Sequence, residues 1–223
     1  RARVLAVDLS LSSLSYAQIK MKELSFSNIE YVQGDITELS KLERRFDLIE
    51  CAGVLHHLGE PLAGWRVLVD LLRAGGLMSI GLYSETARQD IINGHSIIAE
   101  KGYTTSAEDI RRCRQDFIAM AEDGNPTMAK ICNRLDFFSL SECRDLLFHV
   151  QEHRFTLPQI EEALKSLHLK FLGFEMRDQR ALKQFKESYP NSNALTSLSL
   201  WHKFELGNPD TFGNMYQFWC QKS

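Results

Sequence analysis

The first third of the chain alternates between short apolar runs and amphipathic stretches, and this alternation constrains the fold more than any other feature. Between two of the runs, apolar residues recur at helical spacing, at Trp65, Leu68, Val69 and Leu72. Parallel neighbouring strands need a crossover of about this length, and such crossovers are right-handed. We therefore predict an α/β fold with a doubly wound, mostly parallel sheet. Its first strands are expected at residues 3–10, 29–35, 46–53 and 77–83.

The pattern changes after Tyr83. Residues 84–155 carry helix signals but no clear strand, and capping-box patterns open helices at Thr105–Glu108 and Ser139–Glu142. We predict a helical insert after the fourth strand. A helix that begins near Thr156 then leads to two further strands, expected at residues 169–176 and 215–221.

Composition excludes several classes of protein. The chain is 44% hydrophobic and 25% charged, and no apolar run approaches the roughly 18 residues that a membrane span needs. The formal net charge of -3 provides no basic field for nucleic acid. The five cysteines include no C-x-x-C pair, which argues against a disulfide framework or a cysteine zinc site. We expect a cytoplasmic protein without a membrane or nucleic-acid partner.

Small and acidic residues end the predicted strands. Ligands of doubly wound sheets bind outside the carboxyl ends of the strands, so these residues are candidates for a site. Asp8 ends the first run, and its two oxygens suit two adjacent hydroxyl donors. Asp35 follows the second run and suits an exocyclic amine. The third run ends at Cys51, Ala52 and Gly53, where the backbone has room to approach a ligand.

The order of these residues resembles that of a known family, the class I S-adenosylmethionine-dependent methyltransferases. The segments that carry the resemblance are VLAVDLS, VQGDITEL, FDLIECAGVLHHL and LLRAGGLMSIGLYS, which lie between residues 4 and 84. The resemblance implies that S-adenosylmethionine is the cofactor, with Asp8 at its ribose, Asp35 at its adenine and Gly53 near its methionine part. The cofactor-binding residues that we expect on this basis are Asp8, Leu9, Asp35, Ile36, Cys51, Ala52, Gly53 and His56.

One departure from the family's pattern concerns the start of the chain. The glycine-rich loop that normally joins the family's first strand to its first helix is absent, and Arg1 already lies at the start of a strand. We interpret the sequence as an N-terminally truncated fragment and expect residues 1–223 alone to bind the cofactor poorly. We expect one domain, with a cofactor-binding part (1–83), a helical insert or lid (84–155), and C-terminal helices with the last two strands (156–223).

Two groups of histidines are candidates for the acceptor side of the site. His56 and His57 match a histidine pair that helps to shape the pocket mouth in many members of the family, and an insert after Tyr83 would emerge above the cofactor. We therefore expect His149 and His153 to be catalytic. The residues expected to bind the substrate are His57, Tyr83 and Gln151.

The segment HVQEH (residues 149–153) also matches the H-x-x-E-H pattern of certain zinc peptidases. A metal site would require a continuous helix and a third ligand, whereas the capping box at Thr156 indicates that the preceding helix has ended. We therefore expect no metal. The longer segment LLFHVQEHRF resembles bacterial methyltransferase domains, some of which are linked to tetratricopeptide repeats, so such a region is a possible partner in the intact chain.

The predicted activity is transfer of a methyl group from S-adenosylmethionine to a small-molecule acceptor that the sequence does not identify. Two alternatives remain open at this point. One is a methyltransferase-like binding module without catalysis. The other is a nicotinamide-dependent oxidoreductase, although that class does not call for the GDITEL and VLHHL segments.

Overall fold

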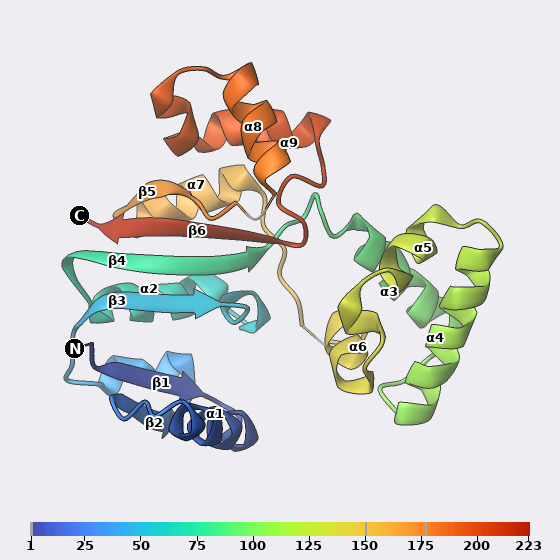
Figure 1. The fold of residues 1–223 in the computed structure, drawn as a ribbon, viewed down its shortest axis with the longest axis horizontal. Coiled ribbons are helices and arrows are strands. Elements are labelled where there is room, and N and C mark those ends of the chain that lie inside the picture. Colours follow the sequence, from blue (N-terminus) through green and yellow to red (C-terminus); the bar gives the residue numbers. More distant parts are fainter. Residues whose placement is uncertain (1, 150, 177) are drawn as a thin grey trace.

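The computed structural model describes residues 2–149, 151–176 and 178–223. Its strands form two sheets (Figure 1). One sheet holds two parallel strands, and the other has the strand order β3-β4-β6-β5. The strands are β1 (Val4–Asp8), β2 (Ile29–Gln33), β3 (Phe46–Ala52), β4 (Leu72–Tyr83), β5 (Leu169–Phe174) and β6 (Met215–Lys222).

Helices connect and cover these strands. The α-helices are α1 (Leu11–Glu23), α2 (Pro61–Leu71), α3 (Gln89–Lys101), α4 (Ala107–Glu122), α5 (Pro126–Cys132), α6 (Leu140–Leu147), α7 (Leu157–Ser166), α8 (Gln179–Ser188) and α9 (Leu198–Gly207). The 3-10 helices are η1 (Ile36–Lys41), η2 (Leu55–His57), η3 (Leu135–Phe137) and η4 (Ser192–Thr196).

The predicted α/β fold is confirmed. β3 pairs with β4 in parallel, whereas β6 runs antiparallel to both β4 and β5. The sheet is nevertheless divided, because within the described residues no hydrogen-bonded pairing joins β1 to β3. Both strands run in the same direction in Figure 1, each with one edge unpaired. Side chains on these strands are correspondingly exposed, with 43% of Val4 and 53% of Leu48 accessible.

The predicted helical insert is present as α3 to α6. Figure 1 shows these helices beyond the arrowheads of β3 and β4, on the side where the carboxyl ends of the strands lie. The insert has its own hydrophobic core, which includes Ile110, Phe117 and Phe137. The main core lies between the four-stranded sheet and its helices and includes Trp65, Met78, Ile80, Phe185, Trp201 and Phe218.

Helix caps explain several of the boundaries. Thr156 and Gln159 form the predicted capping box of α7, and Ser139 caps α6 by accepting a hydrogen bond from Glu142 N. The box predicted from Thr105 is wrong by one residue. Ser106 caps α4 instead, because its hydroxyl oxygen lies 3.1 Å from Asp109 N.

Within the described residues, the model contains no helix that combines the length and the apolar character needed to cross a membrane.

Candidate functional site

The carboxylates of Asp8 and Asp35 lie at the same edge of the small sheet. Asp8 ends β1 opposite Gln33 of β2, two residues before Asp35, and Gly34 N donates to Asp8 O at 3.1 Å. Each carboxylate uses Oδ1 to hold its own turn: Ser10 N lies 2.7 Å from Asp8 Oδ1, and Thr37 N lies 2.8 Å from Asp35 Oδ1. In the part of the chain that the structure describes, no hydrogen bond reaches Oδ2 of either residue, so one oxygen of each remains available to a ligand.

The end of β3 shows why a glycine follows this strand. Gly53 has a φ of +78°, which L side chains rarely adopt, and a Cβ placed on it would meet no atom within 4 Å. Its amide donates to Gly81 O of β4 at 3.4 Å. Cys51 is buried, and burial raises the pKa of its thiol to about 12, so the thiol is neutral. The strand end is therefore open at Gly53 and offers no thiolate nucleophile.

The residues next to these strand ends are more accessible to solvent than Cys51. Leu9 follows Asp8 and is 64% exposed, whereas Ile36 is half-buried at the start of η1 and packs against the main core. Ala52 is exposed beside Gly53. The structure thus brings seven of the eight expected cofactor-binding residues to the carboxyl ends of β1, β2 and β3, with part of their surface free except at Cys51.

His56 differs from this group because its ring is fully buried. The ring stacks on Tyr83 with centroids 3.7 Å apart, and no ring nitrogen of His56 has a hydrogen-bond partner within the described residues. The Arg88 guanidinium lies 3.8 Å from the centroid of the same Tyr83 ring. Since two groups this close cannot share one face, Tyr83 lies between His56 and Arg88. A ligand therefore reaches Tyr83 at its edge or hydroxyl.

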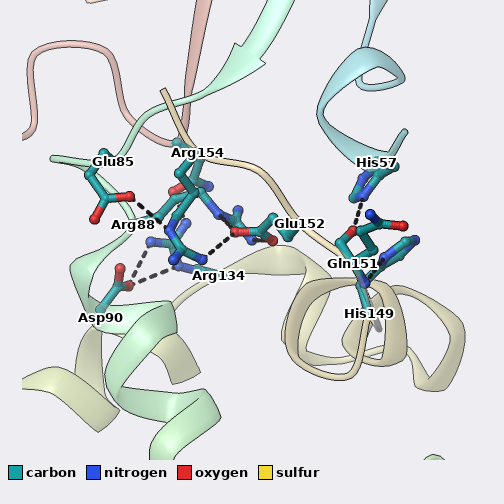
Figure 2. Close-up of polar contacts among 10 residues, drawn as sticks. His57, Glu85, Arg88, Asp90, Arg134, His149, Gln151, Glu152 and Arg154 are labelled. Carbon is teal, nitrogen blue, oxygen red and sulfur yellow. Dashed lines mark hydrogen bonds and ion pairs between the residues drawn. The ribbon is translucent and has the colours of Figure 1, made fainter. Parts of the chain in front are cut away.

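The returning segment of the insert crosses this stack. His57 Nδ1 lies 3.1 Å from the Gln151 carbonyl oxygen, and the His57 and His149 rings are 4.0 Å apart (Figure 2). Gln151 N in turn donates to His149 Nδ1 at 3.4 Å. His153 N donates to His56 O at 2.7 Å, and the His153 Nε2 atom is buried without a partner in the described residues. His57 and Gln151 lie 94 positions apart in the sequence, and the fold brings them into one cluster.

Hydrogen bonding assigns different tautomers to two of these histidines. Because a carbonyl only accepts, His57 Nδ1 carries the proton and Nε2 has a free lone pair. His149 Nδ1 accepts from a backbone amide, so its neutral ring carries the proton on Nε2. Burial lowers the pKa of His57, and it lowers the pKa of His56 to about 3. His56 and His57 are therefore neutral near pH 7.

A buried ion pair that the sequence did not predict holds the returning segment in place. Arg88 Nε and Nη2 lie 3.0 and 2.7 Å from the two carboxylate oxygens of Glu152, and the side chains are 1% and 3% exposed. Arg154 joins this pair to Glu85, as Figure 2 shows. Arg88 and Glu152 are 64 residues apart, and no local pattern links them. In the sequence, the pair is indicated by nothing more than the charged segment EHR at residues 152–154.

The zinc interpretation finds no support in the backbone. α6 ends at Leu147, and residues 151–154 are not helical, so the two histidines of HVQEH do not face one side of a helix. Val150 lies outside the described residues. Among the residues that are described, no three His, Cys, Asp or Glu side chains gather where they could hold a metal ion.

Comparison with known proteins identifies the fold. Residues 1–76 match the family model described as a methyltransferase domain. The structure of PKMT2 from Rickettsia typhi superposes with a TM-score of 0.70 and 14% identity, covering 98% of this chain and 43% of that one. Residues 1–76 thus resemble a methyltransferase domain, and the chain shares the fold of PKMT2. The complex of PKMT2 with AdoHcy superposes with a TM-score of 0.64, 15% identity and the same coverage.

A curated relative of this chain is an uncharacterized protein from Synechococcus sp., which is 27% identical. The match covers 92% of this chain and 51% of the relative. The chain thus spans about half the length of the curated relative and less than half of PKMT2.

The residues at the carboxyl ends of β1, β2 and β3 suit an adenosyl cofactor. Asp8 and Asp35 each leave one carboxylate oxygen without a partner in the described residues, and Gly53 leaves open space at the end of β3. A carboxylate accepts the two adjacent hydroxyls of a ribose, and a backbone without a side chain permits close approach. These residues can hold S-adenosylmethionine, whose chemistry is to supply an activated methyl group.

Proposed function

We propose that this chain forms part of a methyltransferase that binds S-adenosylmethionine at the carboxyl ends of β1, β2 and β3 and methylates a small molecule. The observation that carries the proposal is the position of Asp8, Asp35 and Gly53 at the carboxyl ends of β1, β2 and β3 in a fold shared with PKMT2. The PKMT2 complex, which shares this fold, contains AdoHcy, the product of methyl donation. Asp8 would hold the ribose, Asp35 the adenine, and the backbone near Gly53 the methionine part.

The insert, residues 84–155, would serve as a lid over the acceptor side of this site. Its returning segment places His149, Gln151 and His153 against η2, and the buried Arg88–Glu152 pair fixes that arrangement. Fixing both reactants in one geometry supplies much of the rate enhancement in such a transfer. Among the histidines, His57 has the neutral ring and the free Nε2 lone pair that an acceptor's proton requires.

The test is binding of AdoHcy to the intact protein that contains this chain, measured by isothermal titration calorimetry. Asp8→Asn keeps the Oδ1 acceptor that holds Ser10 N but removes the charge that would face the ribose. A hydrogen bond to a charged group contributes about 1.5–3 kcal/mol, so Kd should rise by about tenfold or more. Asp70→Asn, on the exposed surface of α2, is the matched control and should leave Kd unchanged.

The same titration separates the alternatives. Failure of the intact protein to bind AdoHcy would refute the proposal and favour a binding module without catalysis. Tight binding of NADH in a parallel fluorescence titration would instead favour a nicotinamide-dependent oxidoreductase. Equal AdoHcy affinities of the wild type and Asp8→Asn would place the ribose elsewhere.

A further inference from the structure

A cavity of about 450 Å³ opens beside Tyr83 and Arg88. Distant segments meet around it: the end of β4, η3 of the insert, the residues after β5 and the loop that precedes β6. Figure 1 shows the carboxyl end of β4 beside the start of β6, in the region between the insert and α8. This volume falls within the range of about 300–1,000 Å³ typical of small-molecule sites.

The wall of this cavity combines apolar surface with negative charge. Met176, Phe212 and Met215 supply apolar and aromatic contacts. Four acidic residues line the same cavity, and Arg88, the one cation among the described lining residues, is already paired with Glu152. The four acidic residues are Asp136, Glu175, Asp178 and Asp210.

Two of these four carboxylates have no hydrogen-bond or ion-pair partner within the described residues. Asp178 caps α8 by accepting from Arg180 N, and Asp210 Oδ1 lies 2.5 Å from Lys130 Nζ. The side chains of Asp136 and Glu175, in contrast, make no hydrogen bond or ion pair with any described residue. A cavity lined by several carboxylates that no described residue neutralises favours a cation, because a cleft lined by charges of one sign attracts the opposite charge.

The cavity lies close to the strand end where the methyl donor is proposed to bind. Tyr83 lines the cavity and also stacks on His56, which directly follows the open end of β3. Gly81 forms a thin partition between the two sides. A Cβ on Gly81 would lie 2.7 Å from Met215 Sδ, in the cavity wall, and 3.0 Å from Ala52 Cα, beside Gly53.

We propose that this acidic cavity receives the acceptor, and that the acceptor is a small molecule with a cationic amine attached to apolar carbon. The inference rests on the proposed function, because it names the substrate class of the same site. The ammonium group would first lose one proton to solvent or to His57. Its nitrogen lone pair would then form the new N–CH₃ bond as the C–S bond of the sulfonium breaks, and AdoHcy would leave with the electron pair of that bond.

The experiment compares two probes of similar shape and opposite charge, 2-phenylethylammonium and 3-phenylpropanoate. Saturation-transfer NMR on the intact protein should give a Kd at least tenfold lower for the cation. Raising the salt concentration from 0.05 to 0.5 M should weaken binding of the cation to the wild-type protein. This test does not depend on whether a variant folds. Equal affinities for the two probes, or no binding of either, would overturn the proposal.

Charge-neutral variants locate the site. Asp136→Asn combined with Glu175→Gln should raise the Kd of the cation at least tenfold, whereas Glu162→Gln, on the exposed face of α7, should not change it. Unchanged binding by the double variant would overturn the proposal.

AdoHcy binding, measured in the same samples, distinguishes failure of the cation site from failure of the methyl-transfer proposal. Loss of cation selectivity with AdoHcy binding retained overturns the cavity alone, whereas cation binding without AdoHcy binding overturns the methyl-transfer proposal and keeps the cation site.

Discussion

Arg88 and Glu152 form a bidentate ion pair that joins the first residues after β4 to the segment that returns from the insert. The pair is almost fully buried, and the Arg88 guanidinium also covers one face of Tyr83 at 3.8 Å. A single arginine thus connects the returning segment of the insert to the aromatic stack that ends at His56. The pair therefore fixes the returning segment relative to Tyr83 as well as contributing to stability.

Glu152→Gln should destabilise the protein by about 3 kcal/mol, because it leaves the buried Arg88 charge without a compensating partner. Urea unfolding followed by tryptophan fluorescence measures this change. The control is Asp47→Asn, which breaks an ion pair with Arg73 in which the Asp47 side chain is 82% exposed. That change should cost under about 1 kcal/mol. Equal costs for the two variants would show that the buried pair does not hold the returning segment.

The burial of His56 predicts a dependence of stability on pH. The pKa of its imidazole is about 3 in the folded protein and near 6.5 when unfolded, so the unfolded chain binds more protons between these values. The stability contributed by His56 is therefore complete above pH 6.5 and is lost progressively as the pH falls below it. Between pH 7 and pH 5 the loss should be about 2 kcal/mol.

The comparison that isolates His56 is His56→Phe, which retains an aromatic ring against Tyr83 but does not titrate. Free energies of unfolding from urea titrations at pH 5 and pH 7 give the difference for each protein. The variant should lose about 2 kcal/mol less than the wild type over this interval. An identical pH dependence in both proteins would mean that the His56 ring is protonated without cost in the fold.

Local patterns predicted most of the fold and only part of the site. The strands were found because each is a short apolar run, as in Met215–Lys222, and the acids at the strand ends followed from strand position. α9 (Leu198–Gly207) was missed because its buried stripe of Leu198, Trp201 and Phe204 is short, and the additional apolar residues Leu200 and Leu206 obscure it. The division of the sheet and the Arg88–Glu152 pair depend on contacts between distant segments, which no local pattern records.

Gly53→Ala should weaken cofactor binding and also reduce stability. A residue with a Cβ at φ +78° carries roughly 1–2 kcal/mol of backbone strain, and the methyl group would enter the open space at the end of β3. We expect AdoHcy affinity of the intact protein to fall by about tenfold or more, measured by calorimetry. Gly207→Ala is the matched control, because Gly207 ends α9 without a positive φ and also has open space around it. It should change neither property.

The tautomers of the histidine cluster predict which ring accepts the proton of the acceptor. His57 Nδ1 donates to the Gln151 carbonyl, which leaves Nε2 free, whereas neutral His149 carries its proton on Nε2. In the intact protein, His57→Ala should therefore lower kcat for methyl transfer by about 100-fold or more. His149→Ala and His153→Ala should have smaller effects on kcat. His168→Asn, an exposed position with a φ of +54° that asparagine tolerates, is the control. A loss of kcat on His149→Ala or His153→Ala as large as that of His57→Ala would return the catalytic role to the residues that the sequence favoured.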